Sequence, residues 1–283
     1  MTRPALALAT ALSLIAFAAN SVLCRLALGG HALDAASFTS VRIASGALVL
    51  FVLVRSTGRS TGQARPSERS GWRAACALFA YAACFSFGYG SLTTGTGALI
   101  LFGSVQVTML VVALGNGERL SAAAWLGFGV AAAGLVVLVF PGLSAPSPVG
   151  AVLMVTAGAA WGAYTLLGRG SEAPIADTAR NFLLATPLAV LVSGFTLRHA
   201  AVTPRGIVLA TVSGAITSGL GYTLWYAALR SLSASRAAVL QLLVPLLAAL
   251  GGVVFVSEVL SWRLALASCM ILGGVGLVVT RRG

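Results

Sequence analysis

The sequence predicts an all-α integral membrane protein with ten transmembrane helices in two inverted five-helix repeats. The first observation is composition: 58% of the 283 residues are hydrophobic, 8% are charged, and the mean hydropathy is +0.97. Soluble domains are about 25% charged, so this composition excludes a soluble enzyme and a disordered chain. The second observation is a series of long apolar runs, and the third is a similarity between the two halves of the chain.

Ten apolar runs divide the chain, and each is close to the length of about 20 residues that crosses a bilayer as a helix. A helix satisfies its own backbone hydrogen bonds in lipid, whereas the period-two alternation of a membrane β-barrel is absent. The first run is too long for the apolar core of a signal peptide, so it is interpreted as a span. The runs are 5–28, 35–54, 72–92, 96–114, 122–140, 149–168, 175–197, 206–229, 234–256 and 262–280.

Two segments between these runs are informative about domain organisation. The segment 55–73 is the longest polar stretch, and the turn-rich segment 141–148 lies at the midpoint. We therefore expect a first repeat over 1–142 and a second over 148–283.

An internal repeat relates the halves. Phe17 is followed by Arg25 at the end of the first run, as Trp161 is followed by Arg169 at the end of the sixth. Glu118 and Glu258, 140 residues apart, each lie between two runs. Five spans per half is an odd number, so the second half would enter the membrane from the opposite side, as in many transporters that work by alternating access.

These features resemble the drug/metabolite transporter superfamily and its EamA-type ten-helix exporters, in particular the YddG-like exporters of aromatic amino acids. The second half keeps the typical Trp161-Gly162 pair, whereas the first half has Phe17-Ala18 there. The resemblance implies a secondary transporter that exports amino acids, including aromatic and apolar ones, through a central cavity between the repeats. It also leaves open an exchanger of other metabolites or drugs.

The distribution of positive charge indicates the orientation of the chain in the membrane. All 18 basic residues are arginines, and they lie singly or in small groups between apolar runs rather than in a patch for nucleic acid. With the N-terminus on one side, that side holds 13 of them and the other side 4. The positive-inside rule then predicts that both termini lie in the cytoplasm. We expect the location of such an exporter to be the bacterial inner membrane. The expected partners are lipid and a small-molecule substrate; the oligomeric state stays open and a monomer is compatible.

The sequence lacks the common nucleotide-binding and catalytic motifs. No lysine is present for a nucleotide-binding loop, and no HExxH or GxSxG pattern occurs. We expect no catalytic residue, metal site or cofactor, although an integral-membrane enzyme is the alternative from a different class. All six carboxylates lie at run ends or in separators: Asp34, Glu68, Glu118, Glu172, Asp177 and Glu258.

Arg42 is the one charged residue well inside a run, about 10 Å from its start at 1.5 Å per residue. It either binds a substrate carboxylate, or snorkels to the interface or pairs with Asp34 two turns away. Polar amides inside other runs either contact substrate or form interhelical hydrogen bonds.

Aromatic residues share helix faces, at Tyr81, Phe85 and Tyr89 in the third run, at Trp161 and Tyr164 in the sixth and at Tyr222, Trp225 and Tyr226 in the eighth. They would line a cavity for apolar side chains, or else form interfacial belts, a role that suits Tyr89, Trp225 and Tyr226 near run ends. The residues expected at the substrate site are Phe17, Asn20, Arg42, Tyr81, Phe85, Gln106, Trp161, Tyr164 and Gln241.

Overall fold

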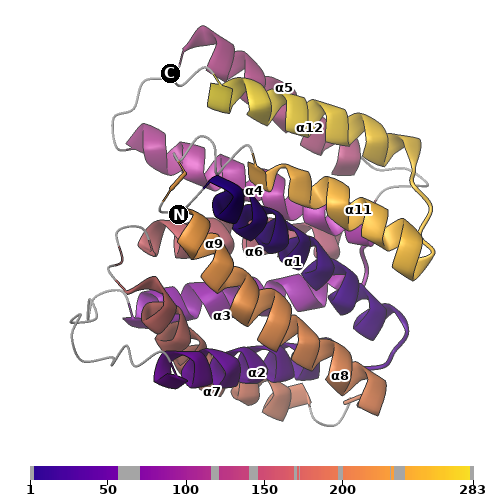
Figure 1. Cartoon of the computed structure of the whole chain (residues 1–283). Coiled ribbons are helices and arrows are strands. Elements are labelled where there is room, and N and C mark those ends of the chain that lie inside the picture. Colours follow the sequence, from indigo (N-terminus) through magenta and orange to yellow (C-terminus); the bar gives the residue numbers. More distant parts are fainter. Residues whose placement is uncertain are drawn as a thin grey trace.

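The computed structural model describes residues 3–56, 71–115, 121–139, 146–168, 171, 173–196, 200–229, 231–232 and 240–280. In these ranges the chain is helical, apart from connections and one isolated antiparallel bridge between Leu33 and Val202 (Figure 1). Most of the segment 55–73 and the repeat boundary at residue 142 lie outside the described residues, as do Glu68, Glu118, Arg169 and Glu172.

The helices of the first half follow the predicted runs closely. They are α1 (Arg3–Gly29), α2 (Ala35–Ser56), α3 (Gly71–Tyr89), α4 (Thr94–Gly115) and α5 (Ala122–Val139). Polar caps set some of the ends. Asp34, for example, accepts hydrogen bonds from the backbone N–H groups of Ala36 and Ser37 and so starts α2.

The second half contains two departures from the expected elements. Its helices are α6 (Pro148–Leu167), α7 (Pro174–Thr196), α8 (Pro204–Val212), the π-helix η2 (Ser213–Leu220), α9 (Gly221–Leu229), α11 (Leu243–Val256) and α12 (Trp262–Thr280). The eighth run is therefore one rod with a π-helix in its middle. Helix α11 begins at Leu243, later than the predicted start at 234, and residues 233–239 lie outside the described part.

Six of the described helices are long and apolar enough to cross a membrane, and three shorter apolar helices accompany them. The prediction of an all-helical membrane protein is confirmed at this level. Ten spans in two inverted repeats stay a prediction.

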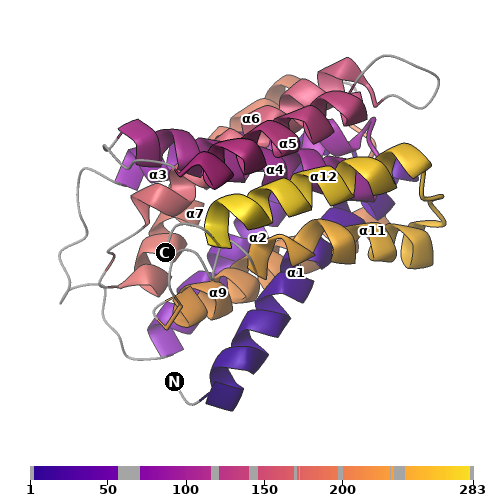
Figure 2. The ribbon, with the colours of Figure 1, turned by 90° about the horizontal axis from the view of Figure 1, so that it is seen from above.

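The two halves are interleaved rather than separate. Helix α1 packs on α9 and α11, whereas α6 packs on α3 and α4. Helices α5 and α12 lie side by side in both views (Figures 1 and 2) and form one edge of the bundle in Figure 1, where α2 packs on α7 at the opposite edge. The centre of the bundle therefore receives side chains from both halves.

Small residues permit the closest approaches. A Cβ atom at Gly158 of α6 would collide with the carbonyl oxygen of Leu101 in α4, and one at Gly214 of η2 would collide with the carbonyl oxygen of Arg42 in α2. Membrane helices associate through close contacts of this kind because lipid supplies little hydrophobic drive for helix association.

Candidate functional site

Arg42 is the charged centre of the site. Arg42 is 2% exposed, and its guanidinium donates a hydrogen bond from Nε to Ser218 Oγ at 3.1 Å. Its Nη2 donates to the phenol oxygens of Tyr81 at 3.0 Å and Tyr222 at 3.4 Å. The Cζ atom also lies 4.8 Å from the centroid of the Phe85 ring. A cation is thus held in the interior by neutral oxygens and aromatic rings.

Asn20 and the π-helix form the polar wall beside Arg42. Asn20 Oδ1 accepts hydrogen bonds from Ser213 Oγ and from Thr217 Oγ1, the latter at 3.3 Å. Asn20 Nδ2 donates to Tyr81 OH at 3.5 Å. Because the π-helix forms i→i+5 hydrogen bonds, its wider turn presents Ser213 to Asn20 and Ser218 to Arg42.

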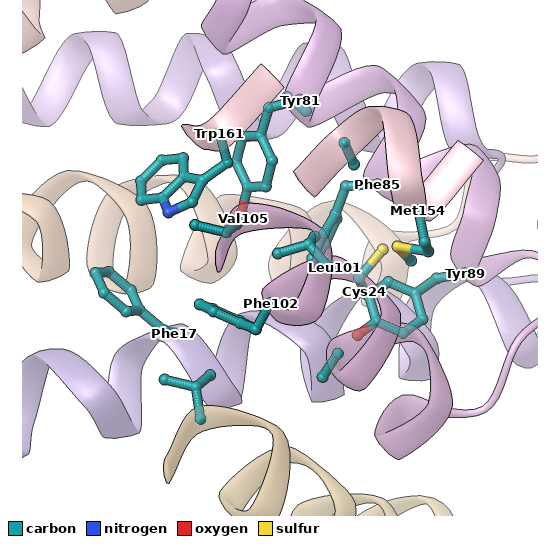
Figure 3. Packing of buried hydrophobic residues seen from close by; sticks show 14 of the residues in the cluster. Phe17, Cys24, Tyr81, Phe85, Tyr89, Leu101, Phe102, Val105, Met154 and Trp161 are labelled. Atoms are coloured by element: carbon teal, nitrogen blue, oxygen red, sulfur yellow. The ribbon is translucent and has the colours of Figure 1, made fainter. Parts of the chain in front are cut away.

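Trp161 is the centre of the apolar wall (Figure 3). Trp161 is 4% exposed, and its ring centroid lies 4.8 Å from that of Tyr81 and 4.9 Å from that of Tyr222. The ring centroids of Phe17 and Tyr164 lie 6.1 Å and 5.6 Å from that of Trp161. Aromatic pairs at these separations contribute attraction beyond their buried area.

Seven of the nine residues expected at the site come together around Arg42 and Trp161: Phe17, Asn20, Arg42, Tyr81, Phe85, Trp161 and Tyr164. Gln106 and Gln241 are buried, as amides inside membrane helices should be, and their part in the site stays a prediction. The site as a whole remains a candidate site.

One of the alternatives for Arg42 is wrong. Its guanidinium does not snorkel, because the residue is buried, and Asp34 is not its partner, because Asp34 Oδ2 has no hydrogen-bond partner in the described ranges and Oδ1 caps α2. The interfacial belt is also wrong for Tyr89 and Trp225, which are both buried, with the ring of Trp225 5.7 Å from that of Phe17.

Sequence reasoning missed the hydroxyl residues of the eighth run and the contact of Tyr222 with Arg42. Ser213, Thr217, Ser218 and Tyr222 all reach the polar centre. The signal that could have found them is the cluster of hydroxyl and glycine residues over 211–221, in an otherwise apolar run. Tyr222 was recognisable as part of an aromatic face, but nothing in the sequence linked that face to Arg42.

The site has the chemistry of binding. It offers cationic, amide and hydroxyl groups beside a large aromatic surface, at the junction of helices from both halves. The described residues contain no group of three His, Cys, Asp or Glu side chains that could hold a metal ion. Apolar helices around such a centre define a multi-pass membrane protein.

The chain belongs to the drug/metabolite transporter superfamily, and its residues 148–280, close to half of its length, match the model of the EamA-like transporter family. It is 49% identical to the uncharacterised protein PA1977 of Pseudomonas aeruginosa over 275 residues, which cover 97% of this chain and 94% of that protein. The threonine/homoserine exporter RhtA of Salmonella typhimurium is 34% identical over 140 residues, about half of each chain. A solved crystal structure with 19% identity covers 94% of this chain with a TM-score of 0.68 and so shares the fold.

Family and relatives point to a membrane transporter rather than an enzyme. A transporter of this family implies a small-molecule substrate and a lipid bilayer as its surroundings. The match to RhtA supports an exporter.

Proposed function

We propose that this protein exports small metabolites, amino acids foremost, by alternating access through a central site between two inverted five-helix repeats. The observation that carries the proposal is the position of Trp161. Its buried ring, on the second half, contacts Phe17 and Tyr81 of the first half, next to the cationic and hydroxyl groups around Arg42. A large aromatic surface beside polar donors suits a zwitterion with an apolar side chain.

The helix contacts support the inverted repeat. If α1 corresponds to α6, α3 to the α8–η2–α9 rod and α4 to α11, then the packing of α1 on α9 and α11 matches the packing of α6 on α3 and α4. The pairs α2 with α7 and α5 with α12 map onto themselves. Helix α1 also begins at the end of the bundle where α12 ends, as an even number of crossings requires (Figure 1).

The relative RhtA supports amino acids as cargo, since it is an exporter of threonine and homoserine. The excess of arginines on one side supports a bacterial inner membrane location with both termini in the cytoplasm. In this arrangement the repeats 1–142 and 148–283 open the central site alternately to each side.

The test is a counterflow assay in proteoliposomes. Vesicles preloaded with one unlabelled amino acid should accumulate the same labelled compound transiently, and the panel should include threonine, homoserine, leucine and phenylalanine. Protein-free vesicles measure leakage. A panel in which no amino acid is accumulated, with protein shown to be folded and inserted, contradicts the proposed cargo.

A further inference from the structure

We infer that Arg42 binds the carboxylate of the substrate, so that the site selects molecules that carry a carboxylate and excludes cations that lack one. The inference deepens the proposed function because it assigns the substrate class of the same site. It rests on the hydrogen bonds of the guanidinium, on its burial and on the absence of a counter-ion among the described residues.

The guanidinium has unused donors. It carries five N–H groups, of which the one on Nε points to Ser218 and those on Nη2 to Tyr81 and Tyr222. Nη1 is buried and has no hydrogen-bond partner in the described structure. Buried polar groups are nearly always paired, so Nη1 is a donor that awaits an acceptor.

Two further hydrogen-bond donors of the site also lack a partner. The indole Nε1 of Trp161 and that of Trp225 are both buried and, in the described ranges, unpaired. Each indole nitrogen can only donate. The phenol oxygens of Tyr81 and Tyr222 accept from Arg42, and the two phenols are also hydrogen-bonded to each other, so the unpaired donors are Nη1 of Arg42 and the two indole N–H groups. A ligand that matches this set must supply acceptors, and a carboxylate supplies acceptors only.

The positive charge of Arg42 also favours a carboxylate ligand. No carboxylate of the described residues lies within ion-pair distance of Arg42, and the ion pair that the structure shows, between Arg25 and Glu258, lies elsewhere. A buried charge without a counter-ion is unfavourable unless another group compensates it. A single carboxylate neutralises it, a cation without a carboxylate is repelled, and one guanidinium with one open nitrogen suits a monoanion better than a phosphate dianion.

The first test uses the unaltered protein. A labelled amino acid that gives counterflow is competed with the unlabelled acid, with its carboxamide, which keeps the amine and the side chain, and with the matching amine that lacks the carboxyl group. We expect only the acid to compete at concentrations near its own apparent Kd, and the other two to need at least tenfold more. Equal competition by acid and carboxamide would overturn the inference.

The second test changes Arg42. Arg42→Gln removes the charge and should raise the apparent Kd for the acid at least tenfold while leaving weak binding of the carboxamide unchanged. Arg42→Lys keeps the charge without the fork of donors and should recover part of the loss. The matched control is Arg55→Gln, which removes the same charge from the exposed end of the same helix and should leave the Kd unchanged. An Arg42→Gln protein that is folded and keeps its discrimination between acid and carboxamide overturns the inference.

Failure of the proposed function can be told apart from failure of this inference. Ligand-induced thermal stabilisation in detergent is measured with simple monocarboxylates and their amides, independently of transport. Stabilisation by carboxylates that is lost in Arg42→Gln supports the inference even if no amino acid is exported. Counterflow of amino acids that ignores both the carboxyl group and Arg42 upholds the proposed function and overturns the inference.

Discussion

At the residue scale, Trp161 joins the halves of the site, because its ring contacts Phe17 and Tyr81 of the first half and Tyr222 of the second. Trp161→Ala should raise the apparent Kd for substrate in the proteoliposome assay. Removing apolar contact worth about 1–3 kcal/mol corresponds to roughly 5- to 150-fold. Trp161→Phe keeps a ring and should lose less.

Trp262 provides a matched control for that measurement, since its side chain is exposed at the start of α12. Trp262→Ala should leave the Kd unchanged. If Trp161 serves only in packing, Trp161→Ala lowers the Tm in detergent while the folded fraction transports with normal affinity. That outcome removes Trp161 from the site.

The residues predictable from the sequence are those that break an apolar pattern. Asn20 and Arg42 stand out as polar residues in apolar runs, and the internal repeat pairs Phe17 with Trp161, so these positions could be proposed without coordinates. Ser213, Thr217 and Ser218 could not, because hydroxyl groups are common in membrane helices and usually bond to their own backbone. In the structure they lie on the π-helix, where Ser213 and Thr217 donate to Asn20 and Ser218 accepts from Arg42.

At the element scale, the fit between α2 and η2 positions Arg42. The π-helix approaches α2 so closely that a Cβ at Gly214 would collide with the backbone of Arg42 and with the side chain of Ser45. Gly214→Ala should therefore destabilise the protein by about 1–3 kcal/mol, as overpacking of a tight interior does. The measurement is the Tm in detergent together with the apparent Kd for substrate.

The control for this substitution is Gly194→Ala in α7, where a Cβ would have no neighbour within 4 Å. Alanine is a better helix former than glycine by up to about 1 kcal/mol, so the Tm should be unchanged or slightly higher. A Gly214→Ala protein as stable as the Gly194→Ala protein contradicts the close fit of η2 on α2.

An ion pair and its hydrogen bonds connect three helices at one end of the bundle. Glu258, just after α11, accepts from Arg25 Nε of α1 at 3.2 Å and from the backbone N–H of Thr94, at the start of α4, at 3.0 Å and 2.8 Å. Arg25 also donates to the carbonyl oxygen of Tyr89 at 3.3 Å. One carboxylate thus connects α1, α4 and α11, which come from both halves of the chain.

Glu258→Ala should lower the Tm and make a cysteine placed at Ser91, in the connection between α3 and α4, react faster with a water-soluble maleimide. Glu258→Gln should have a smaller effect, because its amide oxygen still accepts from Thr94 while the ionic part of the bond to Arg25 is lost. Labelling rates that are identical in all three proteins contradict the role of Glu258 in closure.

At the scale of the whole molecule, the order of the helices predicts opposite sides for the ends of neighbouring spans. Ser56 ends α2 on the predicted cytoplasmic side, and Ser91 follows α3 on the other side; both residues are exposed. After replacement of the four native cysteines, a cysteine at Ser91 should react with an impermeant reagent added to intact cells. A cysteine at Ser56 should react only after the membrane is opened. Reaction of both from the same side excludes the predicted topology and, with it, the inverted repeat.

The charges of the whole molecule also bear on the driving force. Among the described residues, Asp34 and Asp177 lie in or next to the first turns of α2 and α7, and Glu258 lies just after α11. The charge at the centre is Arg42, whose guanidinium keeps its proton throughout the physiological range. Proton-coupled transporters carry protons on acidic or histidine side chains within the membrane, and the described part of this site is built instead around a permanent cation.

We therefore expect net flux of substrate down its own gradient without an imposed pH gradient. Proteoliposomes with equal pH inside and outside, loaded with labelled substrate and diluted into substrate-free buffer, should release it at a rate set by the substrate gradient. Imposing a pH gradient of either sign should change the rate by less than the Arg42→Gln substitution does. If net flux occurs only with a pH gradient, then a proton travels with the substrate or along a route other than Arg42. In that case a permanent charge at the centre would define what the protein binds without defining what drives it.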